Sequence, residues 1–138
     1  MRTIPLLGIV LTLVACGHDG VGPSPTPSTI PGTYNLTTVD GQVLPFTALD
    51  LGAYQAKLVS GTLTLRSDGT YALQFGIRIE DSGNVRTAAE SDGGLWNVNE
   101  KAITLASTQG DSARTGTVSG NVITLQSSIR VFGLTKRQ

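Results

Sequence analysis

The sequence is short of the residues on which most protein chemistry depends. Of its 138 residues one is cysteine (Cys16) and one is histidine (His18), and residues 31–138 contain neither. A single cysteine leaves no partner for an internal disulfide. Without histidine or cysteine, residues 31–138 lack the means for Ser–His–Asp or Cys–His catalysis and the usual zinc ligands. We therefore expect a non-enzymatic domain that holds no metal and no cofactor.

Charge is scarce as well, and neither sign dominates. Charged residues make up 14% of the chain, and ten basic side chains balance ten acidic ones. The arginines from Arg66 to Arg130 stand far apart in the sequence. Proteins that bind nucleic acid carry a basic patch or stripe, so we expect no nucleic acid partner.

The apolar run at the start of the chain is too short to cross a bilayer. A spanning helix needs about twenty apolar residues, whereas the run at residues 4–15, which follows Arg2, has the length of the apolar part of a signal peptide. It ends in Leu13-Val14-Ala15-Cys16-Gly17, which resembles the lipobox of bacterial lipoproteins. The resemblance implies that residues 1–15 are a signal peptide and that Cys16 carries diacylglycerol, often joined by a third acyl chain such as palmitate. The alternative is an ordinary secreted protein with a cysteine near its cleavage site by chance.

Residues 16–30 read as a tether between this lipid and the domain. Proline alternates with serine and threonine over residues 23–28, a composition typical of an extended, solvated spacer. His18 and Asp19 are adjacent, but two neighbouring ligands do not make a metal site, and we expect a solvated histidine. Gly17 stands where lipoproteins kept in the inner membrane commonly have aspartate, so the resemblance implies anchoring in the outer membrane, on its periplasmic or surface face.

From residue 31 to 138 the sequence predicts one all-β domain. Apolar residues alternate with polar ones over residues 70–80, where Tyr71, Leu73 and Phe75 share a parity, and Ser67-Asp68-Gly69 predicts a hairpin turn just before. Other expected strands cover residues 33–39, 43–46, 54–59, 95–98, 101–107, 113–118, 121–127 and 129–135, with a bulge at residues 60–61. Residues 47–53 are the least regular stretch and are compatible with a single helical turn.

Eight to ten short antiparallel strands joined by hairpins predict an up-and-down β-barrel, because closing the sheet removes its exposed edges. The motifs Gly32-Thr33-Tyr34, Ser67-Asp68-Gly69-Thr70-Tyr71, Gly94-Leu95-Trp96 and Gly120-Asn121-Val122-Ile123-Thr124-Leu125 are similar to those of uncharacterised bacterial lipoproteins with a lipocalin-like β-barrel. The resemblance spans residues 32–137 and implies that fold.

Carboxylate pairs are the remaining candidates for catalysis. Glu80 with Asp81, and Glu90 with Asp92, lie beside serine and glycine, where solvated loop charges are the usual finding. Acid–base catalysis needs two carboxylates with separated pKa values around one bond. Calcium binding by the Asp81 or Asp92 loops matches no known loop pattern, so we expect neither.

Aromatic residues supply the candidate ligand pocket. If the barrel holds a cavity, we expect Tyr34, Tyr71, Phe75 and Trp96 to line it. The alternative is that these side chains fill the barrel.

The sequence leaves two main functions open. One is a lipid-anchored module that binds a small apolar ligand, and the other is a structural or protein-interaction module of the cell envelope with a solid core. A hydrolase that uses the carboxylates is the weaker third.

Overall fold

The structure is a computed structural model that describes residues 29–110 and 113–138. Within these residues it is all-β, without an α-helix, as predicted. The strands are β1 (Gly32–Val39), β2 (Gln42–Val43), β3 (Phe46–Asp50), β4 (Tyr54–Leu65), β5 (Thr70–Asp81), β6 (Asn84–Asn99), β7 (Ala102–Ser107), β8 (Arg114–Ser119), β9 (Val122–Gln126) and β10 (Val131–Lys136). None of the described residues belongs to a helix long and apolar enough to cross a bilayer.

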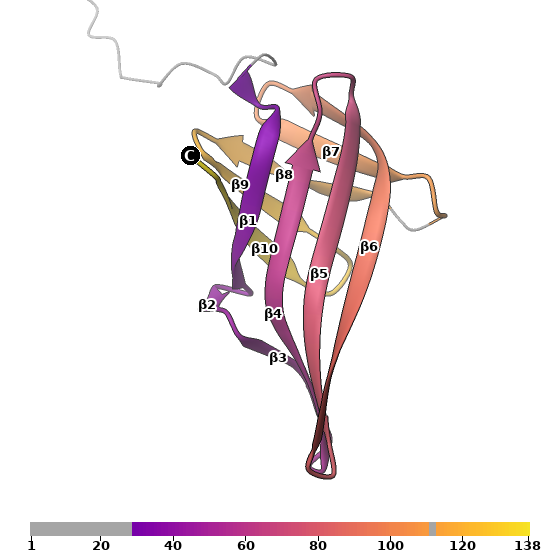
Figure 1. Ribbon diagram of the computed structural model, residues 1–138. Helices are drawn as coiled ribbons and strands as arrows, with labels where there is room; N and C mark the ends of the chain where they lie inside the picture. The colour runs from indigo at the N-terminus through magenta and orange to yellow at the C-terminus, as the bar shows by residue number, and fades with distance from the viewer. Residues whose placement is uncertain (1–28, 111–112) are drawn as a thin grey trace, which may run out of the picture.

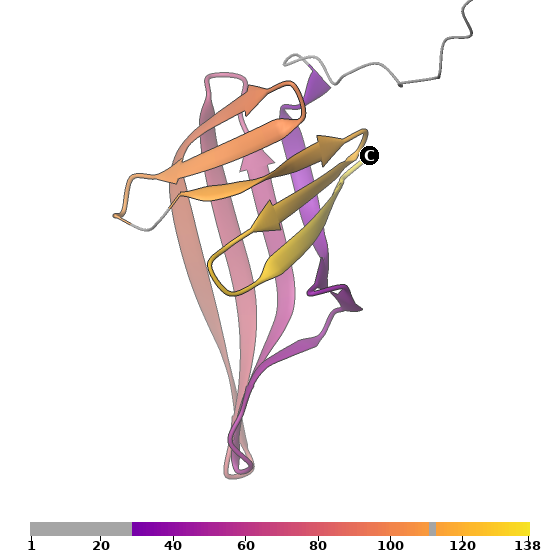
Figure 2. The same ribbon diagram turned by 180° about the vertical axis from the view of Figure 1, so that it is seen from behind.

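Antiparallel pairing closes the sheet into a barrel. Neighbouring strands follow the order β2-β1-β10-β9-β8-β7-β6-β5-β4-β3, and β1 also pairs with β4 from Gly32↔Leu65 to Asn35↔Thr62. Eight strands, β1 and β4 to β10, thus form the closed barrel, while β2 and β3 flank the place where β1 and β4 separate (Figures 1 and 2). The predicted antiparallel β-barrel is therefore confirmed.

Three strands are much longer than the rest and give the barrel an extension. The strands β4, β5 and β6 contain 12, 12 and 16 residues, against 5 or 6 in each strand from β7 to β10. Their far ends, together with β3, run beyond the short strands as a narrow twisted sheet (Figure 1). We call this part, residues 46–59 and 76–90, the flap.

Residues 47–53 form no helical turn, so that prediction is wrong. Most of this stretch belongs to β3, which pairs with β4 from Phe46↔Leu58 to Asp50↔Gln55. The pairing buries Phe46, and the Asp50 carboxylate accepts a hydrogen bond from the Gly52 backbone N–H at 3.0 Å to close the turn. An apolar contact across the sheet therefore outweighs the weak local pattern.

The core lies where the barrel is closed. Its buried residues alternate along the strands as predicted, and the most enclosed are Tyr34, Ile30, Leu63, Leu65, Leu73, Ile103, Leu105, Ile123, Leu125, Leu134, Val39 and Val118. The strands β6 and β7 approach each other closely at Gly94, where an added Cβ would collide with the backbone carbonyl oxygen of Ala106. Only glycine lets the two strands approach so closely.

Ile30 and Tyr34 plug the end of the barrel at which β1 begins. Ile30, at the end of the segment expected to be tether, is 1% exposed, and the Tyr34 hydroxyl donates a hydrogen bond to its carbonyl oxygen at 2.6 Å. Burial raises the pKa of Tyr34 above its ordinary value. The Lys136 ammonium covers the same end, 5.8 Å from the Tyr34 ring centroid. This end of the barrel is therefore closed.

Candidate functional site

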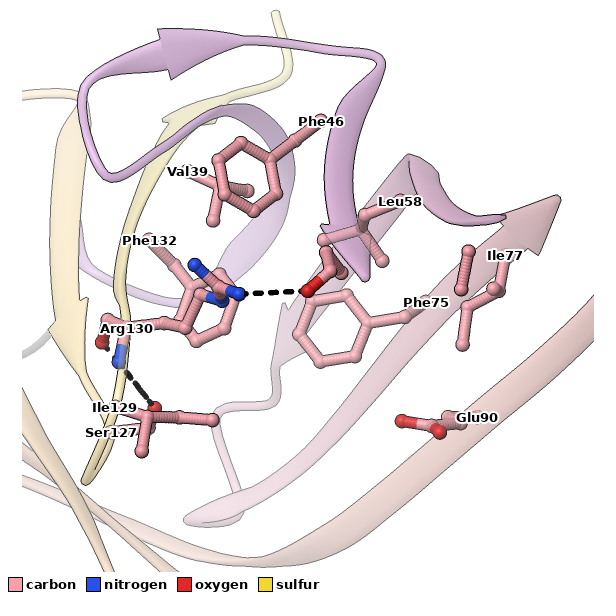
Figure 3. Close-up of a pocket in the computed structure, with 12 residues that line it drawn as sticks. Val39, Phe46, Leu58, Phe75, Ile77, Glu90, Ser127, Ile129, Arg130 and Phe132 are labelled. Atoms are coloured by element: carbon pink, nitrogen blue, oxygen red, sulfur yellow. Dashed lines mark hydrogen bonds between the residues drawn. The ribbon is translucent and has the colours of Figure 1, made fainter. Parts of the chain in front are cut away.

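An apolar cavity opens at the far end of the barrel, between the flap and the segment that joins β9 to β10. Its volume is about 310 Å³, at the lower end of the range for small-molecule sites. Nine of the twelve side chains that line it are apolar: Val39, Phe46, Ala48, Ala56, Leu58, Phe75, Ile77, Ile129 and Phe132 (Figure 3). The other three are Glu90, Ser127 and Arg130.

The flap wall of the cavity follows from a change of parity in β4. The register shifts between Leu58 and Ser60, so a bulge lies next to the predicted position at residues 60–61. Before the bulge Ala56 and Leu58 face the cavity, and after it Gly61 and Leu63 face the barrel interior. One extra residue thus lets a single strand line both the core and the cavity.

Phe75 stands at the boundary between core and cavity. It lies opposite Gly61 on β4, and a Cβ at Gly61 would be only 3.0 Å from the Phe75 ring and 2.8 Å from Leu36. The missing side chain therefore makes room for the ring. The Phe75 ring packs against Phe132 of β10, with centroids 5.4 Å apart and planes tilted by 32°, a favourable aromatic arrangement.

Arg130 forms one rim of the cavity, and its charge is already neutralised. Its guanidinium donates to the Asp40 carboxylate at 2.8 Å and to the Ala48 carbonyl oxygen at 3.1 Å, and it lies 4.7 Å from the Phe46 ring centroid. The hydrogen bond from the Val131 backbone N–H, and then the one from Arg130, hold the pKa of Asp40 below its ordinary value. Arg130 therefore serves to fasten β3 and the β1–β2 turn to β10.

Glu90 forms the opposite rim and has no partner among the described residues. It is paired with Phe75 across β5 and β6, which places the two side chains on one face of the sheet. Figure 3 shows the carboxylate on the cavity side of β6, with no interaction drawn to it. Of the charged side chains that line the cavity, Glu90 is the one left uncompensated.

One of the four aromatic residues expected at a pocket lines this cavity, namely Phe75. Tyr34 lies in the plug at the closed end. Tyr71 is buried in the core, and Trp96 packs against the core while its ring N–H donates to the Arg66 carbonyl oxygen at 2.8 Å. Phe46 and Phe132 join Phe75 at the cavity, because pairing across β3–β4 and β9–β10 brings them to the open end.

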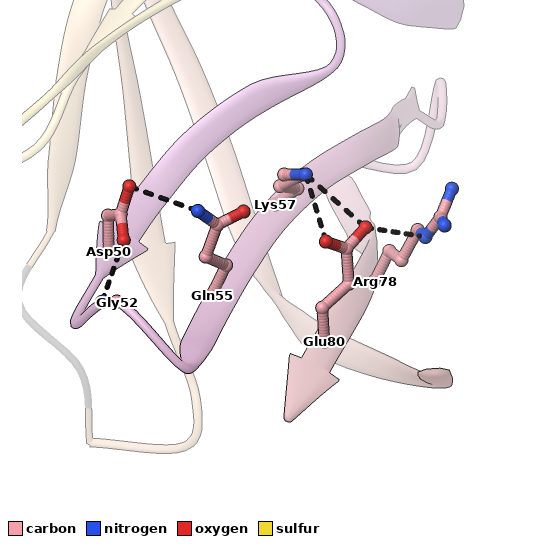
Figure 4. A network of polar contacts seen from close by, with 6 residues as sticks. All are labelled: Asp50, Gly52, Gln55, Lys57, Arg78 and Glu80. Carbon is pink, nitrogen blue, oxygen red and sulfur yellow. Dashed lines mark hydrogen bonds and ion pairs between the residues drawn. The ribbon is translucent and has the colours of Figure 1, made fainter. Parts of the chain in front are cut away.

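Of the four carboxylates expected to be solvated, Asp81 and Glu90 are exposed, whereas Glu80 and Asp92 are engaged by neighbouring side chains. Glu80 lies within β5 and binds the Lys57 ammonium at 3.2 Å and the Arg78 guanidinium at 3.1 Å (Figure 4). The expectation for Asp92 is wrong, since it sits inside β6 and is 9% exposed. No group of three residues able to hold a metal ion occurs in residues 29–110 or 113–138.

Asp92 is enclosed by three hydrogen-bond donors from three other strands, β5, β7 and β8. It accepts from the Tyr71 hydroxyl at 2.8 Å, from the Ser107 hydroxyl at 2.6 Å and from the Arg114 guanidinium. Burial pushes the pKa of Asp92 up, but these three donors together hold it below its ordinary value. Burial, and then the neighbouring carboxylate, raise the pKa of Tyr71 to about 12. The ionised Asp92 carboxylate thus links β6 to β5, β7 and β8 within the wall of the barrel.

Cys16, His18 and the leader lie outside the described residues, so the lipid anchor stays a prediction. Comparison of the chain with family models, with curated proteins and with solved structures gives no match.

Proposed function

We propose that this chain is a non-enzymatic, lipid-anchored protein of the cell envelope whose barrel binds a small apolar ligand at its open end. The observation that carries the proposal is the cavity of about 310 Å³ with nine apolar side chains among its twelve. A pocket with a mostly apolar lining and a few polar groups at its rim is the usual form of a small-molecule site.

The lining favours an apolar ligand because several of its apolar side chains are exposed to water. Ile129 is 81% exposed at the cavity mouth, and Phe75 and Phe132 are only partly buried. Covering apolar surface contributes about 25 cal/mol for each square ångström. A ligand seated between the flap and β10 therefore gains free energy from burying both its own surface and that of these side chains.

The position of the cavity suits a protein that is held by its N-terminus. Ile30 enters at the plugged end, and the eight residues of β1 lead from there to Val39 at the cavity, a distance of roughly 25 Å for an extended strand. A lipid on Cys16 would join the domain at its closed end and leave the mouth accessible.

Titration with the fluorescent apolar probe N-phenyl-1-naphthylamine tests ligand binding. Cell-free synthesis gives the full chain without an attached lipid, and Ala56→Trp fills the cavity with an indole. We expect saturable probe binding by the parent chain and a loss of at least tenfold in affinity in Ala56→Trp. Ala102→Trp, on the exposed start of β7, is the matched control and should bind as the parent does. Equal binding by all three chains, or none, would leave the solid-core structural module as the better account.

Labelling cells with radioactive palmitate tests the anchor separately. The parent chain should take up label and fractionate with the outer membrane, whereas Cys16→Ser should take up none. Label that persists in Cys16→Ser would refute attachment at this cysteine.

A further inference from the structure

The charges at the cavity rim point to a particular class of ligand. Arg130 and Asp40 form an ion pair at 2.8 Å, so together they add no net charge to the rim. Within residues 29–110 and 113–138 Glu90 forms no ion pair. The lining as a whole therefore carries one uncompensated negative charge.

We propose that the cavity selects an apolar molecule that carries a cationic group, with Glu90 as the residue that recognises the cation. This inference rests on the proposed function, since it names the ligand class of the same cavity. A cation next to Glu90 would also lie near Phe75, its cross-strand neighbour, and an aromatic face attracts a cation by its own electrostatics. A carboxylate beside an aromatic ring is thus a fitting receptor for an alkylammonium group.

An anionic ligand such as a fatty acid fits the same rim less well. To bind a carboxylate, Arg130 would have to give up Asp40 or the Ala48 carbonyl oxygen, and the Glu90 carboxylate would repel the ligand. Arg86 has the same orientation in β6 and lies opposite Ile79. It is four residues from Glu90, roughly 13 Å along the strand, and does not line the cavity.

The size of the cavity limits the ligand to a single short chain or a small ring system. A volume of about 310 Å³ lies at the bottom of the range for small-molecule sites, and a lipid with two long acyl chains needs more. The occupant that fits the charge and the volume is a single-chain cationic amphiphile.

Displacement of N-phenyl-1-naphthylamine by three ligands with the same ten-carbon chain tests the selection. The ligands are decyltrimethylammonium, decanol and decanoate, used with the full chain. The two ionic ligands are kept below their micelle-forming concentrations, and decanol is kept below its solubility limit. Because Glu90 is exposed and an ion pair at an exposed site is worth only a modest factor, we expect decyltrimethylammonium to bind about fivefold more tightly than decanol, and decanoate to bind more weakly than decanol.

Substitution of Glu90 ties the preference to this residue. Glu90→Gln should abolish the preference for the cation, so that decyltrimethylammonium no longer binds more tightly than decanol, and Glu90→Lys should reverse the preference in favour of decanoate. Glu80→Gln is the control, because Glu80 lies on the opposite face of the flap with Lys57 and Arg78 (Figure 4), and it should keep the parent preference. Trp96 fluorescence checks that each variant is folded.

The outcomes separate this inference from the proposed function. If decanol binds but the cation shows no advantage, or if the advantage survives in Glu90→Gln, the cation selection is wrong while apolar binding stands. If neither the probe nor any of the three ligands binds, the proposed function fails and the inference fails with it.

Discussion

The buried carboxylate of Asp92 gives the sharpest stability prediction. Asp92→Asn keeps the shape of the side chain but removes its charge, while the Tyr71 and Ser107 hydroxyls and the Arg114 guanidinium remain around it. The amide oxygen can still accept one or two of these hydrogen bonds. The side chain of Arg114, which is only 18% exposed, loses its counter-ion.

The size of the effect follows from these contacts. A hydrogen bond to a charged group contributes about 1.5–3 kcal/mol, and removing one partner of a buried ion pair typically costs about 3–5 kcal/mol. Since the asparagine keeps part of the hydrogen bonding, we expect Asp92→Asn to lower the free energy of unfolding by about 2–4 kcal/mol. The urea midpoint should fall by about 1–2 M.

Urea unfolding followed by the fluorescence of Trp96, the single tryptophan of the chain, measures the change. Asp81→Asn is the control, since Asp81 is exposed and, within the part of the chain that the structure describes, its carboxylate accepts a hydrogen bond only from Ser82. The urea midpoint of this control should stay near that of the parent. Adding Arg114→Gln to Asp92→Asn should recover part of the loss by removing the unpaired charge. A midpoint for Asp92→Asn within experimental error of the parent would refute the role given to this carboxylate.

Three further predictions concern the effect of acidity on stability, the close approach of β6 and β7 at Gly94, and ligand binding in the cavity. The pKa of Asp92 is lowered in the folded protein. The ionised carboxylate therefore stabilises the fold above the pKa of about 3.9 that Asp92 has in the unfolded chain, and this stabilisation is lost as the pH falls through the lower pKa of the folded state. The difference in unfolding free energy between the parent and Asp92→Asn should consequently become smaller from pH 6 to pH 2. Gly94→Ala should destabilise the fold by about 1–3 kcal/mol in urea unfolding, since the new Cβ meets the Ala106 carbonyl oxygen, and an unchanged midpoint would contradict that contact. Bound decanol should raise the melting temperature of the parent chain but not that of Ala56→Trp; an equal rise in both would argue against binding in the cavity.

Strands with one buried face, such as those of the β4–β5 hairpin, were predictable from the alternation of apolar and polar residues. Leu63 and Leu65 share a parity with Tyr71 and Leu73, and the structure buries all four side chains across the β4–β5 hairpin. The first half of β6 was not predicted, because residues 84–91 are exposed and their sequence shows no alternation of apolar and polar side chains. That segment is a strand because the β5–β6 turn aligns it with β5.

The cavity and the Asp92 cluster were harder to predict because they depend on register. The three partners of Asp92 lie 15–22 residues away in sequence and meet it only once β5 to β8 are aligned. One signal was available: continuing the parity of Trp96 and Val98 back along the chain puts Asp92 and Glu90 on the inner face. The sequence held no comparable indication that Phe46 and Phe132 line a cavity. Their position depends on the open end of the barrel, which forms where β1 and β4 separate.

In the proposed function the open end of the barrel binds an apolar molecule, whereas the closed end is solid core. The most direct test is methyl NMR of the full chain, labelled at the isoleucine δ1 positions, during addition of decanol. Ile77 and Ile129 line the cavity, whereas Ile103 and Ile123 are 0% exposed in the core. We predict saturable shifts for Ile77 and Ile129 with little change for Ile103 and Ile123. Signals of Ile77 and Ile129 that stay in place while decanol is present, or equal shifts for all four residues, would contradict the account.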